Sequence, residues 1–256
     1  MNTRKLLINL SKRFPKRIAK QNHDFVGLMV GKLPLEVHKI VICLDLDNQI
    51  IDEVIKIKPD IVFTHHPFIY GSKAKVLKYD LDKKALVDKL ENAGICVYSM
   101  HTNFDTGVGG MNDALSEKLL LKDIYAPEKD PMMRIGFLEN EIDIDSFARY
   151  AIDKLSIDYG LLIKEGNQTI KKVAIVGGGG SRGWRLAKEE NADIYISGDA
   201  PHHVRRDIIN NKFNYLDLPH EIEKIFMPTL GKILIDLDNE LEIIMINHEK
   251  EPKVIN

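Results

Sequence analysis

The chain has 256 residues, a formal net charge of -2, 44% hydrophobic residues and 29% charged residues. This composition is typical of a globular protein with one large domain or two modest ones. The near-zero net charge argues against a protein that neutralises a nucleic-acid backbone, and no apolar run approaches the roughly 18 residues that span a bilayer. Cys43 and Cys96 each lie in an apolar run. They therefore predict buried free thiols and a reducing, cytoplasmic setting rather than a disulfide framework.

The first half of the chain alternates apolar runs with amphipathic segments. A basic segment over residues 4–20 predicts an amphipathic helix with a solvated basic face, and a targeting or nucleic-acid role is the weaker alternative. Beyond it, the pattern predicts buried strands at residues 39–44, 60–64 and 95–100, and helices at residues 48–57, 81–92 and 111–121.

A polar stretch with two prolines at residues 126–131 predicts a domain boundary. After it, the pattern predicts strands at residues 133–138, 172–176, 193–197, 213–217 and 241–246, with helices at 144–155, 182–191 and 201–211. A further helix begins near residue 219, where Pro228 marks either a kink or the first turn of a second helix.

Strands that alternate with helices predict βαβ units and an α/β fold with largely parallel sheets. We expect two α/β domains of related topology. The first comprises residues 1–127 plus about 229–256, and the second comprises residues 128–228. Open α/β sheets place their ligand sites at the carboxyl ends of the strands, so the residues that follow each strand are the candidates for function.

Two histidines follow the strand predicted at 60–64, in the run Thr64-His65-His66-Pro67. Successive strand residues point to opposite faces, so both imidazoles share one site only if the chain turns there. Pro67 favours that turn because it restricts the residue before it. The alternative is one capping histidine and one exposed histidine.

The next two strands also end in polar side chains. His101 and Asp105 follow the strand at 95–100, where Asp105 is placed to bridge two cations and both residues are alternatively loop caps. His220 and Glu223 stand three residues apart at the start of a predicted helix, which places them on one face. The alternative there is an acidic helix N-terminus favoured by the helix dipole.

Taken together, these clusters predict a two-metal site. Neutral nitrogen donors mixed with carboxylates suit zinc, manganese, iron or cobalt better than magnesium or calcium, which prefer oxygen alone. Two cations around a bridging carboxylate share a water, lower its pKa and hold the attacking and leaving oxygens of a hydrolysis reaction.

Two further strand ends carry possible roles. Four glycines at residues 177–180 stand between a strand and a helix, where they either cradle a phosphate on backbone N–H groups or form a tight turn. Asp199 and His203 follow the strand at 193–197 and are our candidates for proton transfer, with helix capping as the alternative.

The order of these motifs resembles the GTP cyclohydrolase 1 type 2 homolog family, also called Nif-three-like, in its short form without an inserted domain. The resemblance covers nearly the whole chain, and its motifs are Asp24-Phe-Val-Gly27-Leu28, Asp60-Ile-Val-Phe-Thr-His-His-Pro67, Tyr98-Ser-Met-His-Thr-Asn-Phe-Asp105, Gly109-Gly110-Met111-Asn112-Asp113, Ile196-Ser-Gly-Asp199 and His220 with Glu223.

The resemblance implies two α/β domains with a dinuclear metal site in the cleft between them, and a ring-shaped homohexamer built from dimers. It implies that the ligands are His65, His66, Asp105, His220 and a glutamate. Many members carry that glutamate four residues after the last histidine, where this chain has Lys224. Glu223 is therefore the expected fifth ligand and Glu221 the alternative.

These observations predict a protein that binds two divalent metal ions and acts as a metal-dependent hydrolase on a nucleotide or another small phosphorylated metabolite. The expected partners are that small-molecule substrate and copies of the chain itself, with no membrane, and nucleic acid is a weaker alternative. Since no residue pattern identifies a substrate, the alternative is a non-catalytic metal-binding assembly or chaperone-like protein.

Overall fold

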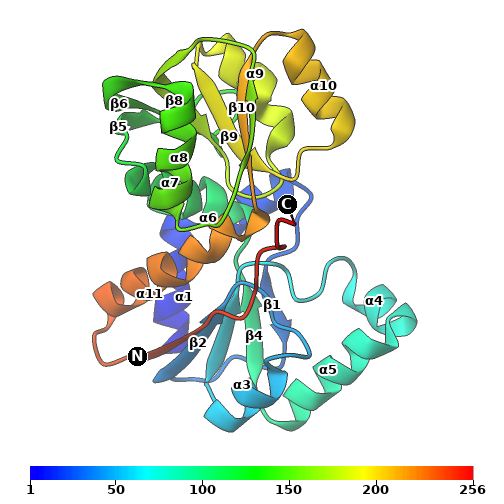
Figure 1. Ribbon diagram of the computed structural model, residues 1–256. Helices are drawn as coiled ribbons and strands as arrows, with labels where there is room; N and C mark the ends of the chain where they lie inside the picture. The colour runs from blue at the N-terminus through cyan, green and yellow to red at the C-terminus, as the bar shows by residue number, and fades with distance from the viewer. Residues whose placement is uncertain (256) are drawn as a thin grey trace. The chain divides into compact units, whose positions relative to one another are not determined.

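The computed structural model describes residues 1–255, which divide into two compact α/β units (Figure 1). Unit 1 comprises Met1–Gly110 and Phe226–Glu249, and unit 2 comprises Met111–Ile225 and the segment from Lys250 onward. The expected α/β class with two sheets is confirmed. Unit 2 begins at Met111 rather than at the predicted residue 128, because helix α7 (Met111–Lys118) packs on strand β6 (Arg134–Asp143) and strand β5 (Lys122–Tyr125) pairs with it.

Unit 1 contains a five-stranded sheet in which four neighbouring strands run parallel and β1 pairs with β4 in the antiparallel sense at one edge. The strands in spatial order are β1 (Gly27–Val30), β4 (Cys96–Ser99), β3 (Ile61–Thr64), β2 (Lys39–Cys43) and β11 (Glu242–Ile246). The helices of this unit are α1 (Thr3–Arg13), α2 (Lys16–Gln21), α3 (Ile51–Ile57), α4 (Lys73–Tyr79), α5 (Leu81–Asn92), α6 (Thr102–Thr106) and α11 (Phe226–Leu237).

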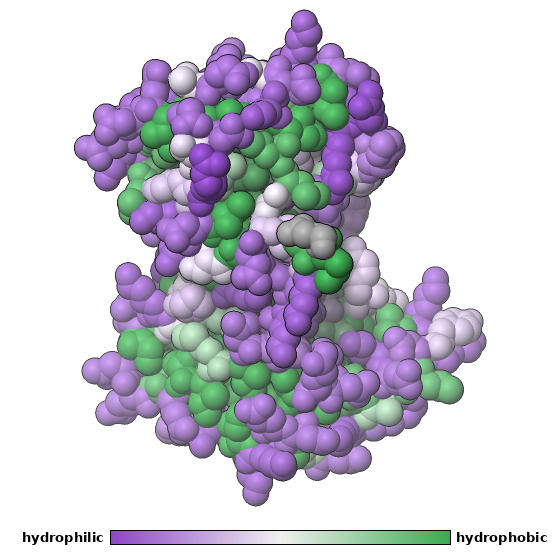
Figure 2. Space-filling model, viewed as in Figure 1, coloured by the Kyte–Doolittle hydropathy of each residue, from purple (hydrophilic) through white to green (hydrophobic). Residues whose placement is uncertain are grey.

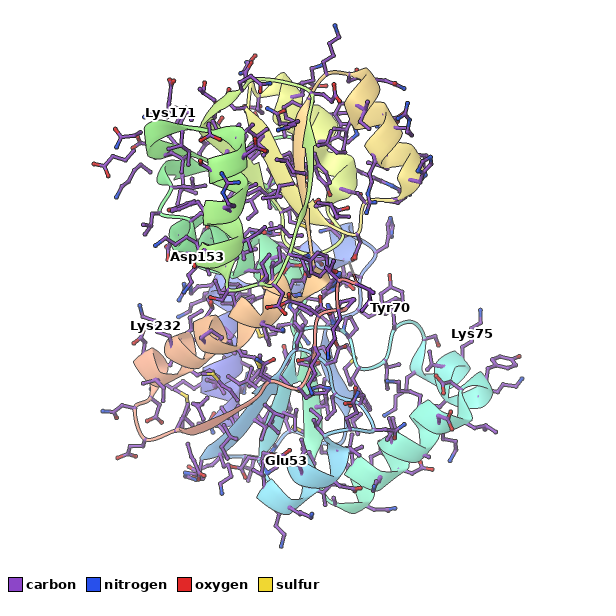
Figure 3. The ribbon with its side chains drawn as sticks, viewed as in Figure 1. Glu53, Tyr70, Lys75, Asp153, Lys171 and Lys232 are labelled. Atoms are coloured by element: carbon purple, nitrogen blue, oxygen red, sulfur yellow. The ribbon has the colours of Figure 1, made fainter. Side chains whose placement is uncertain are left out.

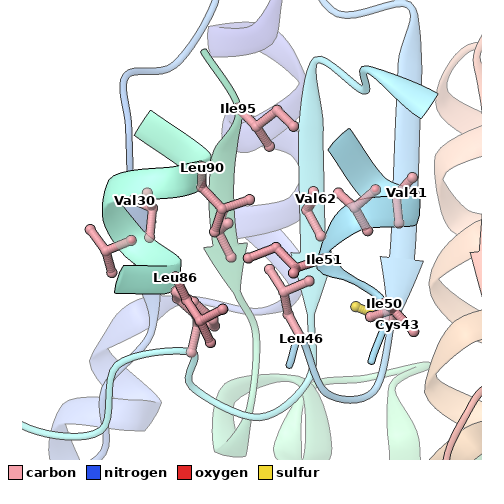
Figure 4. Packing of buried hydrophobic residues seen from close by; sticks show 14 of the residues in the cluster. Val30, Val41, Cys43, Leu46, Ile50, Ile51, Val62, Leu86, Leu90 and Ile95 are labelled. Atoms are coloured by element: carbon pink, nitrogen blue, oxygen red, sulfur yellow. The ribbon is translucent and has the colours of Figure 1, made fainter. Parts of the chain in front are cut away.

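The unit 1 sheet is buried on both faces, because successive strand residues point to opposite sides. Val41 and Cys43 pack with side chains of α3 and α5, as Figure 4 shows. Ile42 points to the other face, toward α11. There Gly231 has no side chain, and a Cβ would lie 2.3 Å from the methyl carbon of the partly exposed Met245, whose flexible side chain would have to move aside.

Unit 2 contains a six-stranded sheet with a shorter parallel part. Its order is β5, β6, β8 (Thr169–Ile175), β9 (Ile194–Gly198), β10 (Asn214–Leu218) and β7 (Leu161–Lys164). Only β8, β9 and β10 are mutually parallel, so the prediction of largely parallel sheets is wrong for this unit. The physical reason is that β5, β6 and β8 are joined by direct antiparallel pairing, and β7 adds an antiparallel edge beside β10.

The helices of unit 2 cover both faces of its sheet. α9 and α10 contribute side chains to one buried cluster, whereas α7 and α8 pack on β6 and β8. These elements are α8 (Ile144–Leu155), the 3₁₀ turn η1 (Ser181–Gly183), α9 (Trp184–Glu189), α10 (His202–Asn210) and the 3₁₀ turn η2 (His220–Ile225). Three strand ends, those of β8, β9 and β10, therefore meet at one edge of this unit.

Local signals set several element boundaries. Asp80 and Asp143 accept hydrogen bonds from the backbone N–H groups of Lys83 and Ser146, and these caps begin the helices predicted at 81–92 and 144–155. Pro228 lies in the first turn of α11, where its missing N–H costs no helical hydrogen bond. The second of the two predicted roles of Pro228 is thus confirmed.

Charged side chains cover much of the surface. Figure 2 shows hydrophilic residues spread over the visible face of each unit, with hydrophobic residues between them. In Figure 3, Glu53, Asp153 and Lys232 point away from their helices into solvent, as their exposure requires. Within residues 1–255, no helix has the length and apolar character needed to cross a membrane.

Candidate metal centre

The predicted turn after β3 is present and brings two imidazoles together. The His65 and His66 backbone N–H groups both bond to the Leu44 carbonyl of the adjacent chain segment, and the Thr64 hydroxyl donates to the His66 carbonyl at 2.8 Å. The His65 and His66 ring centres consequently lie 5.1 Å apart. The two histidines thus share one edge of unit 1.

His101, which the predicted ligand set leaves out, joins this pair. Its ring centre lies 5.0 Å from that of His65 and 5.6 Å from that of His66. Each of the three histidines offers a ring nitrogen, and the three atoms lie within 4.8 Å of one another. Because parallel strands β3 and β4 end side by side, residues 35 positions apart in sequence reach the same place.

Each of these three imidazoles is held through Nδ1. His65 Nδ1 donates to the Met100 carbonyl at 2.9 Å, His66 Nδ1 lies 2.9 Å from an Asp45 carboxylate oxygen, and His101 Nδ1 lies 2.8 Å from an Asp24 carboxylate oxygen. A hydrogen bond at Nδ1 fixes the tautomer and leaves Nε2 as the donor atom toward a metal. Metal-ligating histidines typically make this kind of hydrogen bond, from the ring nitrogen that does not bind the metal to a carboxylate or carbonyl oxygen.

Asp24 is the most strongly held of these acceptors. Its carboxylate also accepts the Thr102 hydroxyl at 2.8 Å and the Phe25 backbone N–H at 2.7 Å, and its side chain is 4% exposed. Burial raises the pKa of Asp24, but the hydrogen bond and charge of His101, with Thr102 and Phe25, outweigh it and lower the pKa to about 2. Asp24 is therefore an ionised anchor at neutral pH.

Asp105 lies in the same part of unit 1, buried within α6 rather than in the predicted loop. One of its carboxylate oxygens lies 3.5 Å from His65 Nε2. The α6 turn produces this position, because the Asp105 backbone N–H bonds back to the His101 carbonyl. The carboxylate thus faces the nitrogen that the His65–Met100 bond leaves available.

Unit 2 carries a second group of ligand-type residues at the end of β10. His220 and Glu223 lie on η2, and the His220 Nε2 is 3.1 Å from a Glu223 carboxylate oxygen. Glu223 is buried, whereas Glu221 lines a pocket of about 210 Å³ together with His220 and Asp199. The geometry thus pairs Glu223, rather than Glu221, with His220.

Asp199 and Gly178 complete the unit 2 group. Asp199 follows β9 with φ of +56°, and its carboxylate contacts His220 Nδ1. Gly178 has φ of +60°, and a Cβ there would lie 2.0 Å from the Glu223 carboxylate. The absence of a side chain at Gly178 therefore allows the backbone of the glycine run to lie close to the Glu223 carboxylate. Phosphate binding by the same run stays a prediction.

The ionisation of His220 follows from this packing. The hydrogen bond with Glu223 raises the pKa of His220, burial lowers it, and the charges of Glu223 and Asp199 raise it further, to about 9. The metal-free imidazole is therefore protonated at neutral pH, and a metal ion that binds there must displace a proton.

His203, the other residue predicted for proton transfer, is exposed in the first turn of α10. Within residues 1–255, no hydrogen bond joins His203 to Asp199. The structure thus gives Asp199 a place beside His220, whereas the proposed role of His203 stays a prediction.

Comparison with known proteins adds to these observations. A sequence model of the family described as Duf34/NIF3 (NGG1p interacting factor 3) matches residues 1–252. A Lactococcus lactis protein named GTP cyclohydrolase 1 type 2 homolog is 31% identical over 96% of both chains, and a Clostridium perfringens protein of the same name is 28% identical over 96% of this chain and 97% of its own.

Solved structures agree in fold. A Bacillus cereus protein related to NIF3 aligns with a TM-score of 0.86 and 19% identity, covering 100% of this chain and 99% of its own. Reduced HcgD from Methanocaldococcus jannaschii aligns with a TM-score of 0.79 and 25% identity, covering 96% of this chain and 97% of its own.

Proposed function

The chain belongs to the Duf34/NIF3 family, and from that membership together with its two histidine-carboxylate groups we propose that it binds two divalent metal ions. The observation that carries the proposal is the Nδ1 pattern. His65, His66, His101 and His220 all contact an acceptor through Nδ1, so each presents Nε2 as a potential ligand atom.

The donor set fits a borderline transition metal. Imidazole nitrogens with carboxylate oxygens suit zinc, manganese, iron or cobalt, whereas an oxygen-only set would suit magnesium or calcium. We assign the ligand roles to His65, His66, Asp105, His220 and Glu223. The close approaches of Asp105 to His65 and of Glu223 to His220 support that assignment, because carboxylate and imidazole are already adjacent within each unit.

We further propose that the protein is a metal-dependent hydrolase of a nucleotide or another small phosphorylated metabolite. When bound, the metal ions would supply an activated water. Asp24, Asp45 and Asp199 hold the imidazoles of the two ligand groups in orientation. Asp199 and His203 are the proposed proton-transfer residues, and the place of His203 on an exposed helix start leaves it accessible to a substrate.

Metal analysis tests the binding proposal. We expect elemental analysis of the purified protein to give two ions per chain, and His65→Ala or His220→Ala to lose metal and thermal stability. His38 is a matched control, because its imidazole is 71% exposed and belongs to neither ligand group. Unchanged metal content in the two ligand variants would refute the assignment.

Turnover is tested separately. Metal-loaded protein is incubated with a nucleotide panel, and product formation is compared with that of Asp105→Ala. Metal binding without turnover on any member of the panel would support a non-catalytic metal-binding role in place of the hydrolase. We also propose a homohexamer built from dimers, which native mass spectrometry tests directly.

A further inference from the structure

Unit 1 carries a cavity that contains none of the proposed metal ligands. This cavity, here called the α1 pocket, has a volume of about 600 Å³ and lies between α1 and the segment from β1 to residue 35. The volume lies within the range of about 300–1,000 Å³ that is typical of small-molecule sites. Its apolar lining is contributed by Leu7, Ile8, Leu28, Leu33, Pro34 and Leu35.

The apolar lining is unusually accessible. Ile8 is 50% exposed, Leu28 is 42% exposed and Leu35 is 87% exposed, and the three side chains belong to one cavity. Single exposed apolar residues are ordinary on a protein surface, but several around one cavity are typical of a binding site. The α1 pocket thus offers apolar contact area that α1 and β1 leave unused.

All the ionisable side chains around the α1 pocket, apart from the Tyr98 phenol, are basic. They come from Arg4, Lys12 and Lys16, and no aspartate or glutamate is part of the lining described. All three residues are exposed, and the Lys16 ammonium lies 5.1 Å from the centre of the Tyr98 ring. Burial lowers the pKa of Lys16, and no carboxylate within the described residues forms an ion pair with it.

This combination indicates the chemistry of the occupant. A partly desolvated ammonium that no carboxylate neutralises favours an anionic group, and the apolar lining beside it favours a hydrocarbon chain. A second copy of the chain bound through the same face across a two-fold axis would bring Arg4, Lys12 and Lys16 against their own copies, where like charges repel. A small amphipathic anion satisfies both features at once.

We propose that the α1 pocket binds an acyl-chain anion, with its anionic head on Lys16 and its chain along Leu7, Leu28 and Leu33. The inference is independent of the metal centre, because the α1 pocket shares no residue with either ligand group. The head group is a carboxylate or a phosphate monoester, which share the charge that Lys16 recognises.

Calorimetric titration below the micelle concentration tests the proposal with four ten-carbon probes: decanoate, decyl phosphate, decanol and decyltrimethylammonium. We expect saturable binding of one or both anions, and binding of decanol and of the cation at least about tenfold weaker, as one ion pair contributes on the order of a tenfold change. The two anions compared with each other identify the preferred head group.

Two variants assign the site. Lys16→Gln should weaken binding of the preferred anion about tenfold without changing the weak binding of decanol. Lys5→Gln is the matched control, because Lys5 is an exposed lysine of the neighbouring helix α1 that lies outside the α1 pocket. The proposal is overturned if neither anion binds, if decanol binds as tightly as the anions, or if Lys16→Gln and Lys5→Gln behave alike.

Discussion

Replacement of Gly178 by alanine would test the packing of the unit 2 ligand group. Gly178 has φ of +60°, and a Cβ at this position would lie 2.0 Å from a Glu223 carboxylate oxygen and 3.2 Å from the His220 ring. The carboxylate is buried and in contact with His220, so it has to move when the methyl group is added. The substitution therefore combines backbone strain with loss of the Glu223–His220 contact.

The two effects have separable magnitudes. An alanine in the left-handed region costs about 1–2 kcal/mol, and loss of a hydrogen bond to a charged group costs about 1.5–3 kcal/mol. We expect Gly178→Ala to lower the free energy of unfolding of the metal-free protein by about 2.5–5 kcal/mol, measured from the denaturant midpoint and slope. We also expect the variant to bind fewer metal ions by elemental analysis, because Glu223 is displaced.

Gly94→Ala is the matched control. Gly94 also has a left-handed backbone, with φ of +71°, but a Cβ there meets no atom within 4 Å. Its cost should be the backbone strain alone, about 1–2 kcal/mol, with metal content unchanged. If Gly178→Ala and Gly94→Ala lower stability equally and keep equal metal content, Glu223 is not held as described.

Three further outcomes are expected. The pKa of His220 in the folded metal-free protein is about 9, above the usual 6.5. The protonated His220 therefore contributes its full stabilisation below pH 6.5, and this stabilisation is lost as the pH rises toward 9. The pH dependence of the thermal midpoint of the wild type, compared with that of His220→Gln, measures this contribution. The pKa of Asp24 is about 2, below the usual 3.8, so the ionised carboxylate stabilises the fold above pH 3.8, and this stabilisation is lost as the pH falls toward 2. Asp24→Ala should lower the free energy of unfolding at pH 7 by about 1–3 kcal/mol, as measured by denaturant unfolding. An unaltered denaturant midpoint would contradict the anchoring role. Burial raises the pKa of Cys96 to about 12, so a thiol reagent at pH 8 should label Cys96 only after unfolding, and rapid labelling of the native chain would show that the strand is accessible.

The sequence predicts the buried elements of this fold better than its edges. The helices predicted at 81–92 and 144–155 have the observed bounds, because strong periodicity coincides with an aspartate cap. β1, β5 and β7 were not predicted, since four-residue strands at or near sheet edges are only partly buried and carry little alternation. α4 likewise has no fully buried residue to mark it.

The candidate metal centre could also be predicted from the sequence only in part. The turn at His65 and His66 could be predicted from Pro67, and His220 with Glu223 from their spacing. The part played by Asp24 could not, because its contact with His101 joins residues 77 positions apart and depends on tertiary folding. His101 itself had a visible signal, since it ends a strand beside the one that ends at His65.

The order in which the strands are synthesised has a consequence for folding on the ribosome. Residues 111–225 form one continuous stretch that carries every strand of unit 2, whereas the unit 1 sheet lacks β11 until residue 246 has been made. Until then β2, an interior strand of the finished sheet, has a bare edge with unpaired backbone groups. We therefore expect the nascent chain to complete its second unit before its first, and to be most prone to aggregation while that edge awaits its last partner.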